Sequence, residues 1–192
     1  MKRILIINHH DSFVHNLVQI IRETPDCTYT FVDTEALADR FAELISTHEY
    51  ILLSPGPGHP EEFTQLIPTI QKCFTTHSIM GVCLGMQAIA LAFGGQLLCL
   101  PSPKHGHKST LQDVNTNAKL FKGLIQPIEV ARYHSWVVSE ESLPKGLTVD
   151  AYDEDGNIAA LSHSEYNIRG VQFHPESIIT KQGRQMITNW LK

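Results

Sequence analysis

The chain has 192 residues, with 15 Lys and Arg against 20 Asp and Glu, so its formal net charge at pH 7 is −5. This length predicts one domain over residues 1–192, which buries roughly 70% of its unfolded surface without disulfide or metal staples. Hydrophobic residues make up 42% of the chain, which excludes a disordered or fibrous protein. The acidic balance and the lack of a Lys/Arg cluster exclude nucleic acid and membrane lipid as principal partners.

Residues 78–103 carry no charged side chain, and an uncharged stretch of this length would suit a membrane span. Glutamines and glycines interrupt this stretch, and its pattern changes from strand-like to helix-like, so we expect a buried strand–turn–helix–strand unit instead. The N-terminal apolar run is too short for a signal peptide. The four cysteines show no C-x-x-C pairing, which is typical of reduced thiols. These features predict a cytoplasmic protein.

The first half of the chain alternates short apolar runs with helical periodicity. We expect strands at residues 3–7, 27–32, 50–53 and 79–82. We expect helices on the apolar faces Phe13-Leu17-Ile20-Ile21, Leu37-Phe41-Leu44-Ile45 and Leu66-Ile67-Ile70-Phe74, and from Cys83 through Phe93. Asp11 or Ser12 is expected to cap the first of these helices. Strands that are apolar on both faces and alternate with helices predict a doubly wound parallel sheet.

The pattern changes after Gly94-Gly95. Short alternating runs at residues 128–132, 147–152, 158–163 and 169–173 are separated by turn signals, which is typical of antiparallel strands. Residues 182–191 read as a short closing helix. The predicted fold class is therefore α/β: a doubly wound, mostly parallel sheet flanked by helices, with a small antiparallel sheet from the C-terminal half.

The segment Gly81-Val82-Cys83-Leu84-Gly85 matches the nucleophile elbow G-x-S-x-G, with Cys in place of Ser. Such an elbow holds its nucleophile on a sharp strand-to-helix turn, where the helix N-terminus favours a thiolate. The N–H of Leu84 is then placed to form half of an oxyanion hole. The alternative for this pentapeptide alone is a buried cysteine in a glycine-containing turn.

A second motif, His174-Pro175-Glu176, follows a predicted strand. Residues i and i+2 of an extended chain point to the same side, so Glu176 can hold the imidazole of His174 in one tautomer while the other nitrogen faces a thiol. A lone motif of this kind would suit a surface turn. Together with the elbow it favours a Cys-His-Glu catalytic triad.

A third segment, residues 54–58, contains two prolines and two glycines directly after a predicted strand. The carboxyl edge of a parallel sheet is where ligands bind in such folds, and a rigid loop there can present N–H groups to an oxyanion. Away from the elbow, the same segment would be a plain turn.

In order and spacing, these motifs resemble the class I glutamine amidotransferases, and within them the small glutaminase subunits of anthranilate synthase and aminodeoxychorismate synthase. The resemblance covers nearly the whole chain and rests on residues 11–13, 16–19, 54–58, 81–87, 93–95, 132–135 and 170–177.

The resemblance implies a function for each motif. Cys83 would attack the carboxamide of glutamine and form a glutamyl thioester, assisted by His174 and Glu176. The residues expected to hold glutamine and the oxyanion are Gly56, Pro57, Gly58, Leu84, Gln87, Ser135 and Trp136. The ammonia released would pass to a larger subunit that adds it to chorismate, and the glutaminase chain would need no cofactor.

The sequence departs from the family pattern at four places: His9-His10 where Asn-Tyr is usual, Met86 for His, Trp136 for Leu, and His105-Gly106-His107-Lys108 where the lysine comes one residue late. The first and last lie in segments that the family uses at or near the synthase interface. We therefore assign His10, Asp11, Ser12 and Lys108 to a partner interface. The histidine pairs lack the spacing of a zinc site, so no metal is expected.

The chain does not distinguish anthranilate from aminodeoxychorismate synthesis, because the acceptor site would lie on the other subunit. Two other functions share some of these features. A free-standing thiol hydrolase, of the α/β-hydrolase or cysteine-peptidase type, would share the elbow, but such hydrolases separate the acid and base widely along the chain. A catalytically silent regulatory subunit would not need an intact triad.

Overall fold

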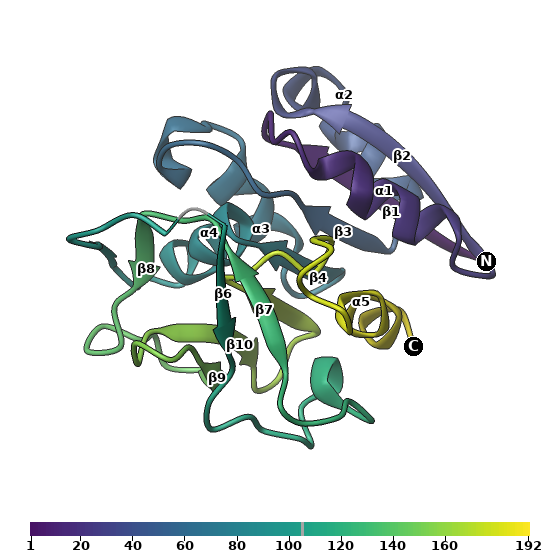
Figure 1. Cartoon of the computed structure of the whole chain (residues 1–192). Coiled ribbons are helices and arrows are strands. Elements are labelled where there is room, and N and C mark those ends of the chain that lie inside the picture. Colours follow the sequence, from purple (N-terminus) through teal and green to yellow (C-terminus); the bar gives the residue numbers. More distant parts are fainter. Residues whose placement is uncertain (105) are drawn as a thin grey trace.

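The computed structural model describes residues 1–104 and 106–192, so His105 of the second histidine pair lies outside the described residues. A seven-stranded sheet forms its centre (Figure 1). In spatial order its strands are β2 (Cys27–Asp33), β1 (Lys2–Asn8), β3 (Tyr50–Leu53), β4 (Ser78–Val82), β11 (Ile168–Val171), β10 (Ile158–His163) and β9 (Leu147–Tyr152).

The strands β2, β1, β3, β4 and β11 run parallel. At the end of the sheet, β10 pairs antiparallel with β11, and β9 pairs antiparallel with β10. Two small antiparallel sheets lie outside this one: β5 (Leu97–Cys99) pairs with β8 (Trp136–Val138), and β6 (His107–Thr110) pairs with β7 (Glu129–Arg132). The predicted fold class is confirmed.

One expectation about the C-terminal strands is wrong. The runs at residues 147–152, 158–163 and 169–173 were expected in the small antiparallel sheet, yet β9, β10 and β11 all belong to the large sheet. Of these three strands, β11 lies inside the sheet and runs parallel to β4. Ile168 and Val171 are fully buried, as in a central strand covered on both faces. A short alternating run cannot reveal this position, because burial of the second face comes from distant helices.

The helices are α1 (Val14–Arg22), α2 (Thr34–Thr47), α3 (Leu66–Cys73), α4 (Leu84–Ala92) and α5 (Gly183–Leu191), with short 3₁₀ turns η1 (Pro60–Glu62) and η2 (Lys119–Phe121). The expected cap on the first helix is wrong. Asp11 Oδ1 accepts the N–H of Phe13 at 2.7 Å and forms a local turn, so the helix begins at Val14 with no side-chain cap. Phe13 is therefore 39% exposed instead of buried on the helix face.

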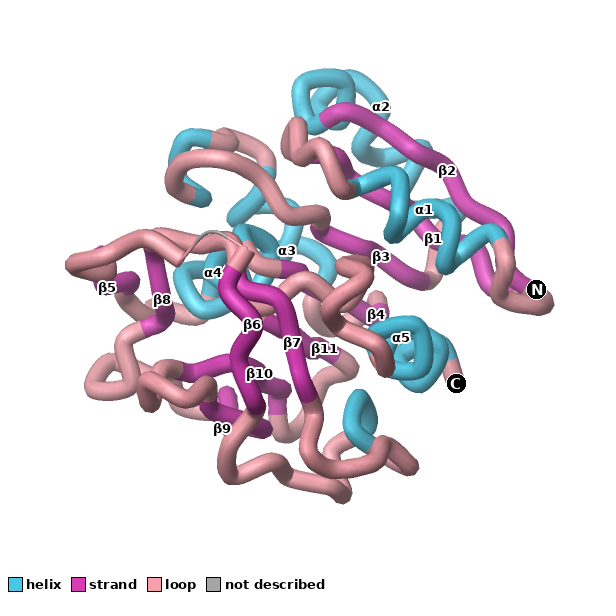
Figure 2. The backbone as a smooth tube through the Cα atoms, in the orientation of Figure 1, coloured by secondary structure: helices cyan, strands magenta, loops and turns pink. Residues whose placement is uncertain are grey.

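The two faces of the sheet have separate apolar layers. Ile4 and Ile6 of β1 pack in a layer with residues of α1 and α5, whereas Leu5 and Ile7 pack in a layer with residues of α2, α3 and α4. This alternation follows the period of two in a strand, and Figure 2 shows the helices around the sheet. The charge-free stretch is β4, α4 and β5, as expected, and none of the described helices is long and apolar enough to cross a membrane.

Candidate active site

The carboxyl ends of neighbouring parallel strands bring together the motifs predicted from the sequence. Ser54 follows β3, Cys83 follows β4 and Gln172 follows β11. Adjacent strands hold these residues in a fixed register, with Leu53 opposite Gly81 and Gly81 opposite Gly170.

Cys83 occupies a strained turn between β4 and α4. Its φ of 52° and ψ of −103° lie outside the regions that L-residues favour, and it directly precedes the first residue of the helix. A Cβ at Gly81 would lie 2.4 Å from the carbonyl carbon of Gly85, so the turn closes only around a glycine. The side chain of Cys83 is 5% exposed and sits where the N-terminal end of α4 favours negative charge.

His174 and Glu176 form a buried pair in which the imidazole Nδ1 lies 2.7 Å from the carboxylate Oε1. Their side chains are 3% and 0% exposed. Because Glu176 occupies Nδ1, the other ring nitrogen faces the Cys83 thiol. Burial disfavours the imidazolium, but the favourable interactions of the ring with Cys83 and with the Glu176 carboxylate outweigh burial and raise the pKa of His174 well above 6.5. The structure thus brings the three predicted catalytic residues together.

A cavity of about 290 Å³ opens beside this triad. Its lining includes the predicted residues Gly56, Pro57, Gly58, Cys83, Gln87, Ser135 and Trp136. Tyr133 and His134 also line it, and the motif at residues 132–135 was the signal that could have identified them. Leu84 is not in the lining. Its side chain is buried beneath Gly56, where an added Cβ would lie 2.7 Å from Leu84 Cδ2.

The loop at residues 54–58 rests on His9. The His9 N–H donates to Ser54 Oγ at 2.8 Å, and Ser54 Oγ–H donates to the carbonyl of Pro55 at 2.6 Å. His9 is fully buried, and burial lowers its pKa to about 4, so the ring is neutral. His9, one half of the His9-His10 departure from the family pattern, therefore supports the loop from below and offers no side chain to a partner.

None of the four residues assigned to a partner interface is among those that line the cavity beside the triad. The side chains of His10 and Lys108 are 51% and 57% exposed, and they pair with Glu35 and Glu129. Ser12 is exposed and Asp11 is partly buried. Phe13, which follows them, contacts His174 with ring centroids 6.3 Å apart, so this segment reaches the triad directly.

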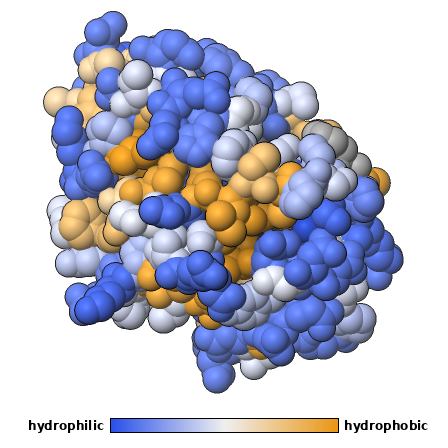
Figure 3. Space-filling view, turned by 90° about the vertical axis from the view of Figure 1, so that its left-hand side faces the viewer, coloured by the Kyte–Doolittle hydropathy of each residue, from blue (hydrophilic) through white to orange (hydrophobic). Residues whose placement is uncertain are grey.

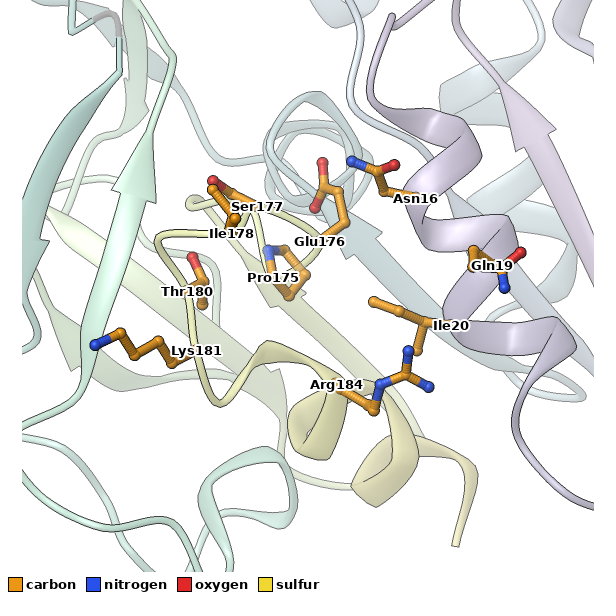
Figure 4. Close-up of a pocket in the computed structure, with 10 residues that line it drawn as sticks. All are labelled: Asn16, Gln19, Ile20, Pro175, Glu176, Ser177, Ile178, Thr180, Lys181 and Arg184. Carbon is orange, nitrogen blue, oxygen red and sulfur yellow. The ribbon is translucent and has the colours of Figure 1, made fainter.

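A second cavity of about 320 Å³ lies on the α1 side of the triad (Figure 4). Glu176 lines it, with its carboxylate directed toward the Asn16 amide, and Ile178 at its rim is 94% exposed. In the described part of the chain, one group of three side chains could hold a metal: Asp11, His174 and Glu176, with ligand atoms within 4.8 Å of one another. His174 Nδ1 and Glu176 Oε1 already contact each other there. The expectation of no metal stays a prediction.

Comparison with known proteins agrees with this geometry. A family model described as glutamine amidotransferase class-I matches residues 5–192. The chain is 40% identical to a putative anthranilate synthase component II of Haemophilus influenzae, over 98% of this chain and 95% of that one. It is 36% identical to an aminodeoxychorismate/anthranilate synthase component 2 of Bacillus subtilis, again over 98% and 95%. A putative GMP synthase subunit from Thermoplasma acidophilum shares its fold, with a TM-score of 0.85 at 23% identity, over 100% of this chain and 92% of that one.

Proposed function

Since this chain belongs to the class I glutamine amidotransferase family, we propose that Cys83, His174 and Glu176 hydrolyse glutamine to glutamate and ammonia. The observation that carries the assignment is the buried His174–Glu176 pair, whose free ring nitrogen faces the cysteine of the elbow. A free-standing hydrolase of another fold is not supported, because the family model covers nearly the whole chain.

The geometry suits a thioester mechanism. The Cys83 sulfur attacks the carboxamide carbon of glutamine, and the carbonyl oxygen becomes an oxyanion stabilised by backbone N–H groups of Leu84 and of the loop at Gly56. The C–N bond then breaks, and the proton held on His174 passes to the leaving nitrogen, which departs as ammonia. His174 next accepts a proton from water as the water attacks the thioester. Glutamate leaves and the thiol is regenerated.

The partner that receives the ammonia is a chorismate-using synthase subunit. Two of the relatives described above are named as components of such synthases. The face of the molecule seen in Figure 3 carries a hydrophobic band between hydrophilic regions, and exposed apolar area of this kind marks interaction sites. His10, Asp11, Ser12 and Lys108 stay the predicted contacts with this subunit.

A diazoketone that mimics glutamine is expected to alkylate Cys83 and to leave Cys27, Cys73 and Cys99 unmodified. Burial raises the pKa of Cys73 to about 11 and also raises that of Cys27, which keeps both as thiols. Cys99 is exposed in β5 and is not among the described residues that line the cavity beside the triad. Peptide mass mapping identifies the labelled residue, and preferential labelling at another cysteine would remove Cys83 as the nucleophile.

Glutaminase turnover is expected to rise about 5–150-fold when the synthase binds with chorismate, because free release of ammonia wastes glutamine. We expect His10→Ala and Lys108→Ala to reduce this stimulation while basal turnover persists. Lys145→Ala is the matched control, since Lys145 is exposed in the turn before β9. Turnover that is equal with and without each chorismate-using synthase of the source cell would refute the partner assignment.

A further inference from the structure

A buried amide that the triad does not account for lies beside the nucleophile. Gln172 follows β11, is 2% exposed, and places its Nε2 3.6 Å from the Cys83 sulfur. That distance suits an N–H···S hydrogen bond. Whether this amide donates to the sulfur depends on which of its two ends faces Cys83.

Hydrogen-bond partners in and beside the 290 Å³ cavity next to the triad determine the orientation of the Gln172 amide. The backbone carbonyl of Trp136 can only accept, so Gln87 must present its Nε2 to it, at 2.8 Å. The same Nε2 lies 3.1 Å from Gln172, which must therefore present its Oε1 as the acceptor. The other end of the Gln172 amide, the donor Nε2, is then the end that faces Cys83.

The Trp136 carbonyl is itself held in place from the protein interior. The Nε–H of Arg132 can only donate and lies 3.4 Å from His134 Nε2, so His134 carries its proton on Nδ1. That Nδ1–H donates to the Trp136 carbonyl at 3.1 Å. Burial and the nearby Arg132 lower the pKa of His134 to about 3, so the ring keeps this neutral form at ordinary pH.

We propose that Gln172 is a further catalytic residue, which donates a hydrogen bond from Nε2 to the Cys83 sulfur and stabilises its thiolate. Hydrogen bonds to a charged acceptor are about twice as strong as neutral ones, so the bond favours the thiolate over the thiol. His174 supplies positive charge to the sulfur and Gln172 supplies a neutral donor. The inference rests on the proposed role of Cys83 as the nucleophile.

The test follows the alkylation of Cys83 by iodoacetamide, an uncharged reagent that needs no glutamine turnover, from roughly pH 5 to pH 9. Peptide mass mapping separates Cys83 from the other cysteines. In Gln172→Met, which removes the donor, we expect the rate near the lower end of this range to fall about tenfold, the change that the loss of a hydrogen bond to a charged group gives. At the upper end of the range, the rate is expected to match that of the unmodified chain.

Gln172→Asn is the second variant, because it keeps a buried amide and withdraws the donor by about 1.5 Å, one C–C bond length. It is expected to show the same loss confined to low pH. Gln185→Met, on the exposed face of α5, is the matched control and should leave the pH profile unchanged. Circular dichroism establishes that each variant is folded.

Unchanged profiles in both folded Gln172 variants would overturn the proposal. So would a rate lowered by the same factor at every pH, because that would show a structural role only. Failure of the glutaminase assignment would be seen separately, as a chain whose Cys83 alkylates with the expected pH dependence but which does not turn over glutamine with its synthase.

Discussion

A Cys83→Ala variant in complex with its synthase is expected to lose glutamine-dependent product formation by roughly 10⁴-fold or more, the scale seen when a covalent nucleophile is removed. The other cysteines cannot replace Cys83, because they lie on other elements: Cys27 in β2, Cys73 in α3 and Cys99 in β5. The substitution removes one buried sulfur and leaves the glycines of the elbow unchanged, so the turn and the fold should persist. Product formation with glutamine as nitrogen donor is the measurement.

Free ammonium provides the control, because it reaches the acceptor on the synthase without the triad. Activity with ammonium should persist in Cys83→Ala, and its loss would place the defect in folding or assembly. His174→Ala should behave in the same way as Cys83→Ala. Glu176→Gln should retain more activity, since it removes an orienting group and neither the nucleophile nor the base. Substantial glutamine-dependent activity in Cys83→Ala would contradict the mechanism.

Arg132→Met is expected to lower the free energy of unfolding by about 3–5 kcal/mol, the cost of breaking a buried ion pair from one side. The Arg132 side chain is 2% exposed, and its Nη2 lies 2.8 Å from Asp153 Oδ2, itself 3% exposed. Methionine fills a similar volume but leaves the Asp153 carboxylate buried without its counter-charge. Urea denaturation measures the change.

Two further variants distinguish the effect of an unpaired buried charge on stability from an unspecific loss of stability. Lys104→Met removes the 3.0 Å ion pair with Asp155, whose side chain is 42% exposed, and should change stability by at most about 1 kcal/mol. Adding Asp153→Asn to Arg132→Met should recover some of the loss, because it removes the uncompensated charge while its Oδ1 can still accept the N–H groups of Asp155 and Asn157. If Arg132→Met lost no more stability than Lys104→Met, the unpaired buried carboxylate of Asp153 would not be the cause of the loss.

Much of the fold was predictable because its signals are local. β1, β3 and β4 are built on short apolar runs, and β9 and β10 begin and end at the predicted residues. The placement of β11 between β4 and β10 was not predictable from its own short pattern, since it depends on which distant segments cover its two faces. The start of α1 was misplaced because the Asp11 side chain forms a turn of its own instead of a helix cap.

The candidate active site likewise has parts that short sequence motifs encode and parts that depend on contacts between distant segments. Cys83, His174 and Glu176 stand in two short motifs and were predictable one motif at a time. The chain of polar contacts from His134 through Gln87 to Gln172 joins three separate segments, and no local pattern encodes it. The burial of His9 beneath residues 54–58 was missed for the same reason.

The register between β4 and β11 has a consequence for how this enzyme can be switched on. Val82 lies opposite Val171, so the nucleophile and the segment that bears its base leave the sheet from adjacent positions, about 4.8 Å apart as neighbouring strands are. To move them apart, a regulator would have to break the pairing of central strands, which are among the most stable regions of a protein against opening. We therefore expect a resting state that spares glutamine to keep the triad assembled, and we expect the proposed synthase partner to act instead on the orientation of the peptide groups at Gly56, which would receive the oxyanion.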